Sequence, residues 1–413
     1  MVRLLLIALC CLGLLVSAEP VVPPTPLSPG GAEPVPASGV TTWAAPQMPA
    51  QPNQREELGF ANVTLRTMVR ISAGGSGVRV RLDNTYGDRP LRIGAASVAR
   101  ADGFDGSSLP GTVRPLLLEG RSDFTVPPGH HRYTDPAGLV VPDGSRLHIS
   151  LFLPGPTGPL GNHPMSGEPT LLARGDHTGN PTSDRFRPVE HRPVVDAVLV
   201  LGSEASGTVV AVGGSLTDGL GVDFPESGRW PDVLADRLLA LPPGQRLAVA
   251  NSGLSGNRIL LGSVGGGPPL LDRYDTDVLS LPGAAAVILA VGTNDIQQTP
   301  HETDARTLFD AIDDLARQSR DAGMRVVVCT IPPFGNWETW KPELETTRTR
   351  VNALIRTHAD EYDAVFDLDT LLRDPDEPEL VRPDLDLGDG LHLNQRGYTL
   401  VGESVPVEAL LPR

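Results

Sequence analysis

Residues 207–219 read Gly-Thr-Val-Val-Ala-Val-Gly-Gly-Ser-Leu-Thr-Asp-Gly, and this stretch decides the fold of the second half of the chain. Nothing polar interrupts Val209 to Val212, which indicates a strand buried on both faces, as in a parallel sheet. Two glycines then allow a tight turn that approaches a ligand closely. A helical pattern follows from Trp230 to Leu241. Ligands bind at the carboxyl ends of the strands in open α/β sheets, so Ser215 is a candidate nucleophile.

The same alternation continues to the C-terminus. Further apolar strands are expected at 247–250, 285–291, 326–331 and 364–368. Helical segments separate them, and in the helix after Thr303 one face carries Leu308, Ile312 and Leu315. Repeated βαβ units of this kind predict a catalytic domain at residues 205–413 that is built around a parallel sheet.

Residues 56–204 show the pattern of a β-rich domain. Apolar and polar residues alternate from Val78 to Asp83, as in a strand with one face in a core, and Arg79, Arg81 and Asp83 are expected to face water. Alternation returns at 147–153, and 195–201 is a further candidate strand. Turn clusters such as Pro142-Asp143-Gly144 recur between these segments. Short strands between regular turns predict a β-sandwich or jelly-roll.

The N-terminus has the features of a secretory signal peptide at residues 1–18. Arg3 precedes an apolar run of 13 residues, Leu4 to Val16, which is shorter than the roughly 20 that a spanning helix needs. We therefore expect a secreted protein, either extracellular, periplasmic or wall-associated, without stable membrane insertion. Residues 19–55 are rich in proline, glycine and alanine and predict an extended linker, in which Trp43 is either docked or loosely held.

Composition limits the classes of partner. The net charge is −16 and the pI is about 5.0, which argues against nucleic acid and anionic membrane surfaces as partners. Without the signal segment the sole cysteine is Cys329, so stability must come from the hydrophobic core instead of disulfides. We expect no cofactor and no metal. The oligomeric state stays open.

Three more polar loops follow predicted strands or precede the last helix, at the sheet edge where Ser215 is expected. They are Asn251-Ser-Gly-Leu-Ser-Gly-Asn-Arg258, Gly292-Thr-Asn-Asp295 and Gly388-Asp-Gly-Leu-His-Leu-Asn394. A serine needs a base, and histidine, with an ordinary pKa of roughly 6.5, suits that role. Asp389 and His392 are three residues apart on a turn, so the carboxylate can orient the ring toward Ser215. The amides of Ser215 and Gly256 and the side chain of Asn294 are candidate oxyanion donors.

These four loops, in this order, resemble the four sequence blocks of the SGNH hydrolases, also called GDSL esterases and lipases. The resemblance covers about 206–410 and implies a flavodoxin-like, three-layer α/β/α domain. It further implies that Ser215 is nucleophile and oxyanion donor, that Gly256 and Asn294 are the other donors, and that His392 and Asp389 are base and acid. The β-rich domain before it looks like a known secreted two-domain arrangement.

One position departs from the family pattern. The family usually has Gly-Asp-Ser at the nucleophile, and Gly214 stands here in place of the aspartate. That aspartate shapes the family's active site and is not part of its triad, so the departure concerns rate and loop rigidity. The Gly-x-Ser-x-Gly elbow of α/β-hydrolases is absent, because Thr217 stands at its last position.

Two further groups of residues have alternative interpretations. Five histidines, which lack a ligand spacing, are expected on the surface and not at a metal: His130, His131, His163, His177 and His191. Three aromatic residues in the loop after 326–331 either line a sugar or acyl site or pack within the loop: Phe334, Trp337 and Trp340.

The sequence thus predicts a secreted serine esterase that acts on a small-molecule or polysaccharide ester, and that removes a short acyl group such as acetyl through an acyl-enzyme. Export, an acidic surface and a possible carbohydrate-binding β domain favour a polar substrate. A lipase or lysophospholipase for longer chains would use the same residues. A non-catalytic wall-binding protein, in which the hydrolase has decayed at Gly214, is the alternative from another class.

Overall fold

The computed structural model describes residues 36–412, apart from 37, 165–167, 223–227 and 264. The predicted signal peptide and the first part of the predicted linker lie outside the described residues.

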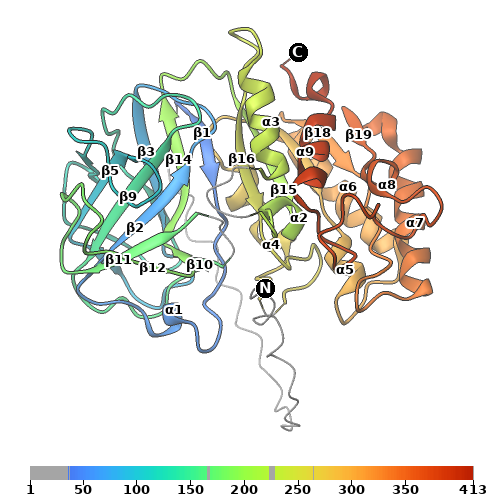
Figure 1. The fold of residues 1–413 in the computed structure, drawn as a ribbon, viewed down its shortest axis with the longest axis horizontal. Coiled ribbons are helices and arrows are strands. Elements are labelled where there is room, and N and C mark those ends of the chain that lie inside the picture. Colours follow the sequence, from blue (N-terminus) through green and yellow to red (C-terminus); the bar gives the residue numbers. More distant parts are fainter. Residues whose placement is uncertain (1–35, 37, 165–167, 223–227, 264, 413) are drawn as a thin grey trace, which may run out of the picture. The chain divides into compact units, whose positions relative to one another are not determined.

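The second half of the chain is built around a parallel five-stranded sheet (Figure 1). Its strand order is β16-β15-β17-β18-β19, the flavodoxin-like order in which the first strand in the chain lies second in the sheet. The strands are β15 (Thr208–Gly213), β16 (Ala248–Gly253), β17 (Ala284–Ala290), β18 (Arg325–Cys329) and β19 (Ala364–Phe366). All five lie within a few residues of the predicted strands, and the predicted parallel α/β fold is confirmed.

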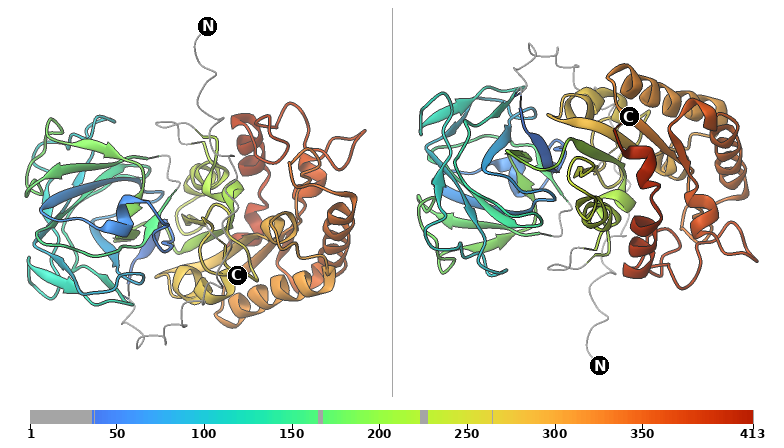
Figure 2. Two further views of the ribbon diagram at one scale, coloured as in Figure 1. Left: turned by 90° about the horizontal axis from the view of Figure 1, so that it is seen from below. Right: turned by 90° about the horizontal axis from the view of Figure 1, so that it is seen from above.

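Helices cover both faces of this sheet because alternate strand residues point to opposite sides. On one side Val210, Val212 and their neighbours pack with α6 (Ala305–Asp321) and α7 (Pro342–Thr357). On the other side Val209 and Ala211 pack with α3 (Trp230–Leu239) and α9 (Gln395–Ser404). The two further views show the orange helices α6 and α7 on the side opposite to α3 and the red α9 (Figure 2). The domain therefore has three layers.

Short helices continue the chain at the sheet edge where the site lies. They are α2 (Ser215–Asp218), α4 (Leu270–Tyr274), α5 (Thr293–Gln297) and α8 (Leu368–Leu372).

The first half is a sandwich of two antiparallel sheets around a shared apolar core, as predicted. One sheet has four strands: β1 (Val40–Ala44), β14 (Val195–Leu201), β3 (Gly77–Asp83) and β8 (His131–Tyr133). The other has six: β12 (Arg187–Val189), β11 (Thr170–Arg174), β2 (Val63–Arg70), β9 (Arg146–Leu153), β5 (Ala95–Arg100) and β6 (Arg114–Pro115).

The predicted linker is wrong for its later part, because Val40–Ala44 forms strand β1 and pairs with β14. Thr41 donates from its amide and its hydroxyl to the carbonyl of Pro282, at 3.0 and 2.9 Å. Trp43 is only 4% exposed and lies under the guanidinium of Arg192. The run Val-Thr-Thr-Trp favours a strand, and its burial outweighs the proline-rich composition around it.

The expectation that the polar face of β3 meets water is also wrong. Arg81 is 1% exposed and pairs with Asp196 on β14 at 2.9 Å. Its Nη1 donates to the carbonyl of Thr276, which belongs to the second half of the chain. The polar face of this sheet is therefore covered at Arg81, and this buried charge is paired because an unpaired buried charge is costly.

Candidate active site

Ser215 lies at the carboxyl end of β15, where two glycines let the backbone turn into α2. A Cβ on Gly213 would lie 2.7 Å from the carbonyl oxygen of Ala290 on the neighbouring strand, and a Cβ on Gly214 would lie 2.7 Å from Nδ2 of Asn294. Both distances are shorter than real Cβ contacts, so side chains at these positions would displace their neighbours. Because Gly213 and Gly214 have no side chains, the turn that carries Ser215 can lie close to β17 and to the loop after it.

The structure brings together Ser215, His392 and Asp389. The Oγ of Ser215 lies 2.8 Å from Nε2 of His392, and Nδ1 of His392 lies 2.7 Å from Oδ2 of Asp389. Since the carboxylate accepts the proton of Nδ1, Nε2 is left as the acceptor for the serine hydroxyl. This arrangement can remove a proton from the serine as it attacks.

The carboxylate of Asp389 is fixed by its own turn. Its Oδ1 accepts hydrogen bonds from the amides of Leu391 and His392, at 3.0 and 2.8 Å. Burial by itself raises the pKa of Asp389, but the hydrogen bonds from the His392 amide and ring and from the Leu391 amide outweigh it and lower that pKa below its usual value. The carboxylate is therefore held in the charged form that orients the ring.

Two of the candidate oxyanion donors are backbone amides, those of Ser215 and Gly256. Within the described part of the chain, the amides of Ser215 and Gly256 have no protein acceptor. Gly256 adopts a φ of +75°, which favours glycine, and the loop that it turns runs directly after β16. Unused donors at a nucleophile are what an oxyanion site requires.

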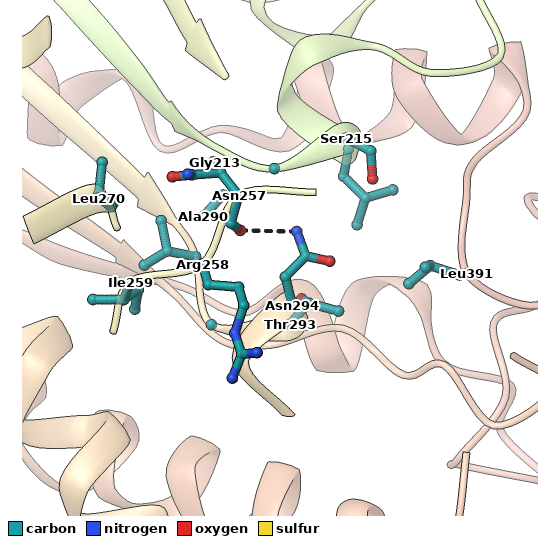
Figure 3. Close-up of a pocket in the computed structure, with 14 residues that line it drawn as sticks. Gly213, Ser215, Asn257, Arg258, Ile259, Leu270, Ala290, Thr293, Asn294 and Leu391 are labelled. Atoms are coloured by element: carbon teal, nitrogen blue, oxygen red, sulfur yellow. Dashed lines mark hydrogen bonds between the residues drawn. The ribbon is translucent and has the colours of Figure 1, made fainter. Parts of the chain in front are cut away.

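The third candidate donor, Asn294, is held by two neighbours. Its Nδ2 donates to the carbonyl of Asn257 at 2.9 Å, and its Oδ1 accepts from Nε2 of Gln297 at 2.9 Å (Figure 3 shows the first bond). The amide nitrogen also lies beside the nucleophile turn, since a Cβ on Gly214 would be 2.7 Å from it. The second N–H of Nδ2 is thus available to a ligand.

Residues 211–400 match the GDSL-like Lipase/Acylhydrolase family. This part of the chain is a GDSL-like lipase/acylhydrolase domain. This domain accordingly belongs to a family of acyl hydrolases.

Several solved structures are similar to the chain. A GDSL-like lipase from Bacteroides thetaiotaomicron is 18% identical over 49% of this chain and 88% of its own, with a TM-score of 0.38. A family two carbohydrate esterase from Cellvibrio japonicus is 11% identical over 89% of this chain and 96% of its own, with a TM-score of 0.35. An acetyl xylan esterase is 22% identical over 48% of this chain and 97% of its own, with a TM-score of 0.37. A comparison with curated protein sequences gave no match.

The three aromatic residues of the loop after β18 lie in different environments. Trp337 meets the ring of His392 edge to face, with centroids 5.6 Å apart, and donates from Nε1 to Oε1 of Gln297. Trp340 is partly buried against the core. Phe334 is fully buried within that core, which agrees with the alternative of packing within the loop and not with a place in the substrate site.

Sequence reasoning missed the residues that hold the loops of the GDSL-like domain. The carboxylate of Asp295 is fully buried and accepts the amides of Ile259 and Leu260, at 3.0 Å each. It thereby joins the loop after β17 to the loop after β16. Gln297 links Asn294 to Trp337. Their position beside Asn294 was the available signal, because residues next to a catalytic block often support it.

Within the described residues, no group of three or more histidine, cysteine, aspartate or glutamate side chains is placed to hold a metal ion. In the same part of the chain, no helix has the length and apolar character needed to cross a membrane.

Proposed function

We propose that the GDSL-like domain hydrolyses esters of short acyl groups, with Ser215 as nucleophile, His392 as general base and Asp389 as the acid that orients it. The observation that carries the proposal is the unbroken hydrogen-bond chain from Asp389 through His392 to Ser215, at 2.7 and 2.8 Å. The family match independently supports an acyl hydrolase.

In the first half of the reaction, the Oγ of Ser215 attacks the ester carbonyl and its proton passes to Nε2 of His392. The carbonyl oxygen becomes negatively charged, and the amides of Ser215 and Gly256 and the Asn294 side chain donate to it. When the tetrahedral intermediate collapses, the bond to the alcohol breaks and the alcohol leaves with the proton from His392. The acyl group remains on Ser215.

In the second half, His392 takes a proton from water, and the resulting hydroxide attacks the acyl carbon. The same donors stabilise the second oxyanion. The bond to the Oγ of Ser215 then breaks, Ser215 recovers its proton from His392, and the carboxylic acid is released. No group outside the triad, the donors and water takes part in this scheme.

The pocket beside Ser215 favours a small acyl group. It has a volume of about 20 Å³, room for one or two water-sized bodies, and its apolar walls include Leu216, Ile259, Leu270 and Leu391 (Figure 3). An acetyl methyl group fits such a space, whereas a long chain would have to lie outside it. We therefore propose that acetyl esters, including those on carbohydrate, are better substrates than the long-chain esters that a lipase hydrolyses.

Purified protein tests the nucleophile. We expect hydrolysis of p-nitrophenyl acetate, and Ser215→Ala should lose roughly 10⁶-fold in kcat while unfolding at the same temperature as the unchanged protein. A fluorophosphonate probe should label Ser215 alone. Equal activity of the two proteins would refute the assignment and would favour a non-catalytic binding protein.

Chain length tests the acyl preference. Across p-nitrophenyl acetate, butyrate, octanoate and decanoate, kcat/KM should be highest for acetate. A higher kcat/KM for decanoate than for acetate would contradict the short-acyl proposal and support a lipase. Release of acetate from an acetylated polysaccharide, with the deacetylated polymer as the blank, extends the comparison to a polymer.

We also propose that the protein is exported. The support is the charged, apolar and small-residue order of residues 1–18. Expression of the full chain in a bacterial host should give mature protein outside the cytoplasm that begins after Ala18. An intact N-terminus on cytoplasmic protein would contradict this.

A further inference from the structure

His163, in the short strand β10 (Asn162–His163) of the first half, is buried against the helix that carries Ser215. It is 2% exposed, so the prediction of a surface histidine is wrong at this position. Its Nε2 lies 3.0 Å from Oδ1 of Asp218, and its Nδ1 lies 2.8 Å from the carbonyl oxygen of Pro46. Both ring nitrogens therefore lie within hydrogen-bond distance of an oxygen atom, which fixes the orientation of the ring between Pro46 and Asp218.

The other oxygen of Asp218 holds the loop after β16. Oδ2 accepts from the hydroxyl of Ser255 at 2.6 Å and from the amide of Ser255 at 3.2 Å. Asp218 also ends the helix that Ser215 begins, and its amide donates to the carbonyl of Gly214 at 2.9 Å. One carboxylate therefore connects the nucleophile turn to the residue that immediately precedes Gly256.

The first half of the chain supports the same loop at two more points. The amide of Gly265 donates to Oε1 of Gln51 at 3.3 Å. Met48, which is fully buried, forms a bridge with Asn162, and a Cβ on Gly267 would lie 3.0 Å from the Cβ of Met48. The loop that carries Gly256 is therefore held from outside the parallel sheet as well as by Asp295.

We propose that His163 is a positioning residue for the oxyanion site, acting through Asp218 and Ser255 on the backbone amide of Gly256. The proposal rests on the proposed roles of Ser215 and Gly256. Preset donors are effective because they need not reorganise during the reaction, and a displacement of about 1 Å far from the chemistry can cost roughly 100-fold. On this view the β-rich half is part of the catalytic apparatus.

The test substitutes His163→Gln in the full chain, with His191→Gln as the matched control. His191 also pairs with a carboxylate, Oε2 of Glu56 at 2.9 Å, but both residues belong to the first half. For p-nitrophenyl acetate we expect kcat to fall roughly 10- to 100-fold in His163→Gln with KM unchanged, and no change in the control. If both variants lose the same thermal stability and both keep the original kcat, His163 has only a structural role and the proposal is overturned.

Ser255→Ala gives a second variant that leaves the buried His163–Asp218 pair intact. If His163 acts through Ser255, the double variant should lose little more in kcat than the more affected single variant. Independent effects that multiply would contradict the proposed route.

Hydrogen exchange supplies a readout that does not depend on activity. Peptides covering residues 254–263 should exchange faster in His163→Gln than in the unchanged protein, and at the unchanged rate in His191→Gln. If the unchanged protein hydrolysed no ester, the proposed function would fail, while this measurement would still decide whether His163 holds the loop. Identical exchange in all three proteins would overturn the link.

Discussion

Oδ2 of Asp389 lies 2.7 Å from Nδ1 of His392, three residues further along the same turn. The carboxylate therefore fixes which ring nitrogen carries the proton, and Nε2 is left to accept the proton of Ser215. Asp389→Asn should keep the turn but remove this control, and we expect kcat on p-nitrophenyl acetate to fall roughly 10⁴-fold. Asp376→Asn, at an exposed loop position, is the control and should keep full activity.

The stability of the protein at acid pH should depend in part on Asp389. Its pKa is lowered in the folded protein, so its contribution to stability is complete above the ordinary aspartate value, about 3.9, and is lost as the pH falls through the lowered value. Over the pH range in which this contribution is complete, Asp389 is also in the charged form that the triad requires. We would measure the thermal unfolding midpoints of the unchanged protein and of Asp389→Asn between pH 3 and pH 7. The difference between the two midpoints should be smallest at the acid end of this range. A difference that grew toward low pH would contradict this.

Gly214 makes room for Asn294. A Cβ there would lie 2.7 Å from Nδ2 of Asn294, so Gly214→Ala should displace the amide from the carbonyl of Asn257 and move the third oxyanion donor. We expect kcat to fall roughly 10- to 100-fold with little change in KM. Gly179→Ala is the control, because a Cβ there meets nothing within 4 Å, and it should leave kcat and KM unchanged. Retained activity in Gly214→Ala would show that Asn294 tolerates the displacement.

The buried pair Arg81–Asp196 should matter for stability. Its side chains are 1% and 2% exposed, and removal of one partner leaves a buried, unpaired charge. Arg81→Met should lower the free energy of unfolding by about 3–5 kcal/mol in denaturant titrations. Arg92→Met removes the exposed pair with Asp123 and should cause no measurable loss. Equal effects of the two substitutions would refute this distinction.

Much of the fold and of the site followed from local patterns. Uninterrupted apolar runs indicated the parallel strands, and alternation indicated β3 and β9, because the period of a pattern reports how a strand is buried. The loops that carry Ser215 and Asn294 could be placed at one edge because the carboxyl ends of parallel strands lie together. The hydrogen bonds between Ser215, His392 and Asp389 agree with that placement.

The errors share one physical cause. Arg81 was expected in water, His163 on the surface and Val40 to Ala44 in a linker, yet all of them are buried. In each case the partner that covers the residue is distant in sequence: Thr276 for Arg81, Asp218 for His163 and Pro282 for Thr41. A local sequence pattern reports the polarity of a residue, but it does not show which segment, distant in the chain, will cover that residue.

The sequence by itself determined which side chains have the chemistry for ester hydrolysis and which strands deliver them, because strand period, glycine turns and residue type are local properties. Tertiary structure alone decided that Phe334 belongs to the core while Trp337 meets His392, and that a histidine of the β-rich half reaches the carboxylate next to Ser255. Such contacts depend on how two packed surfaces meet. Their free energy comes from burial and pairing between segments that the chain separates by tens to hundreds of residues.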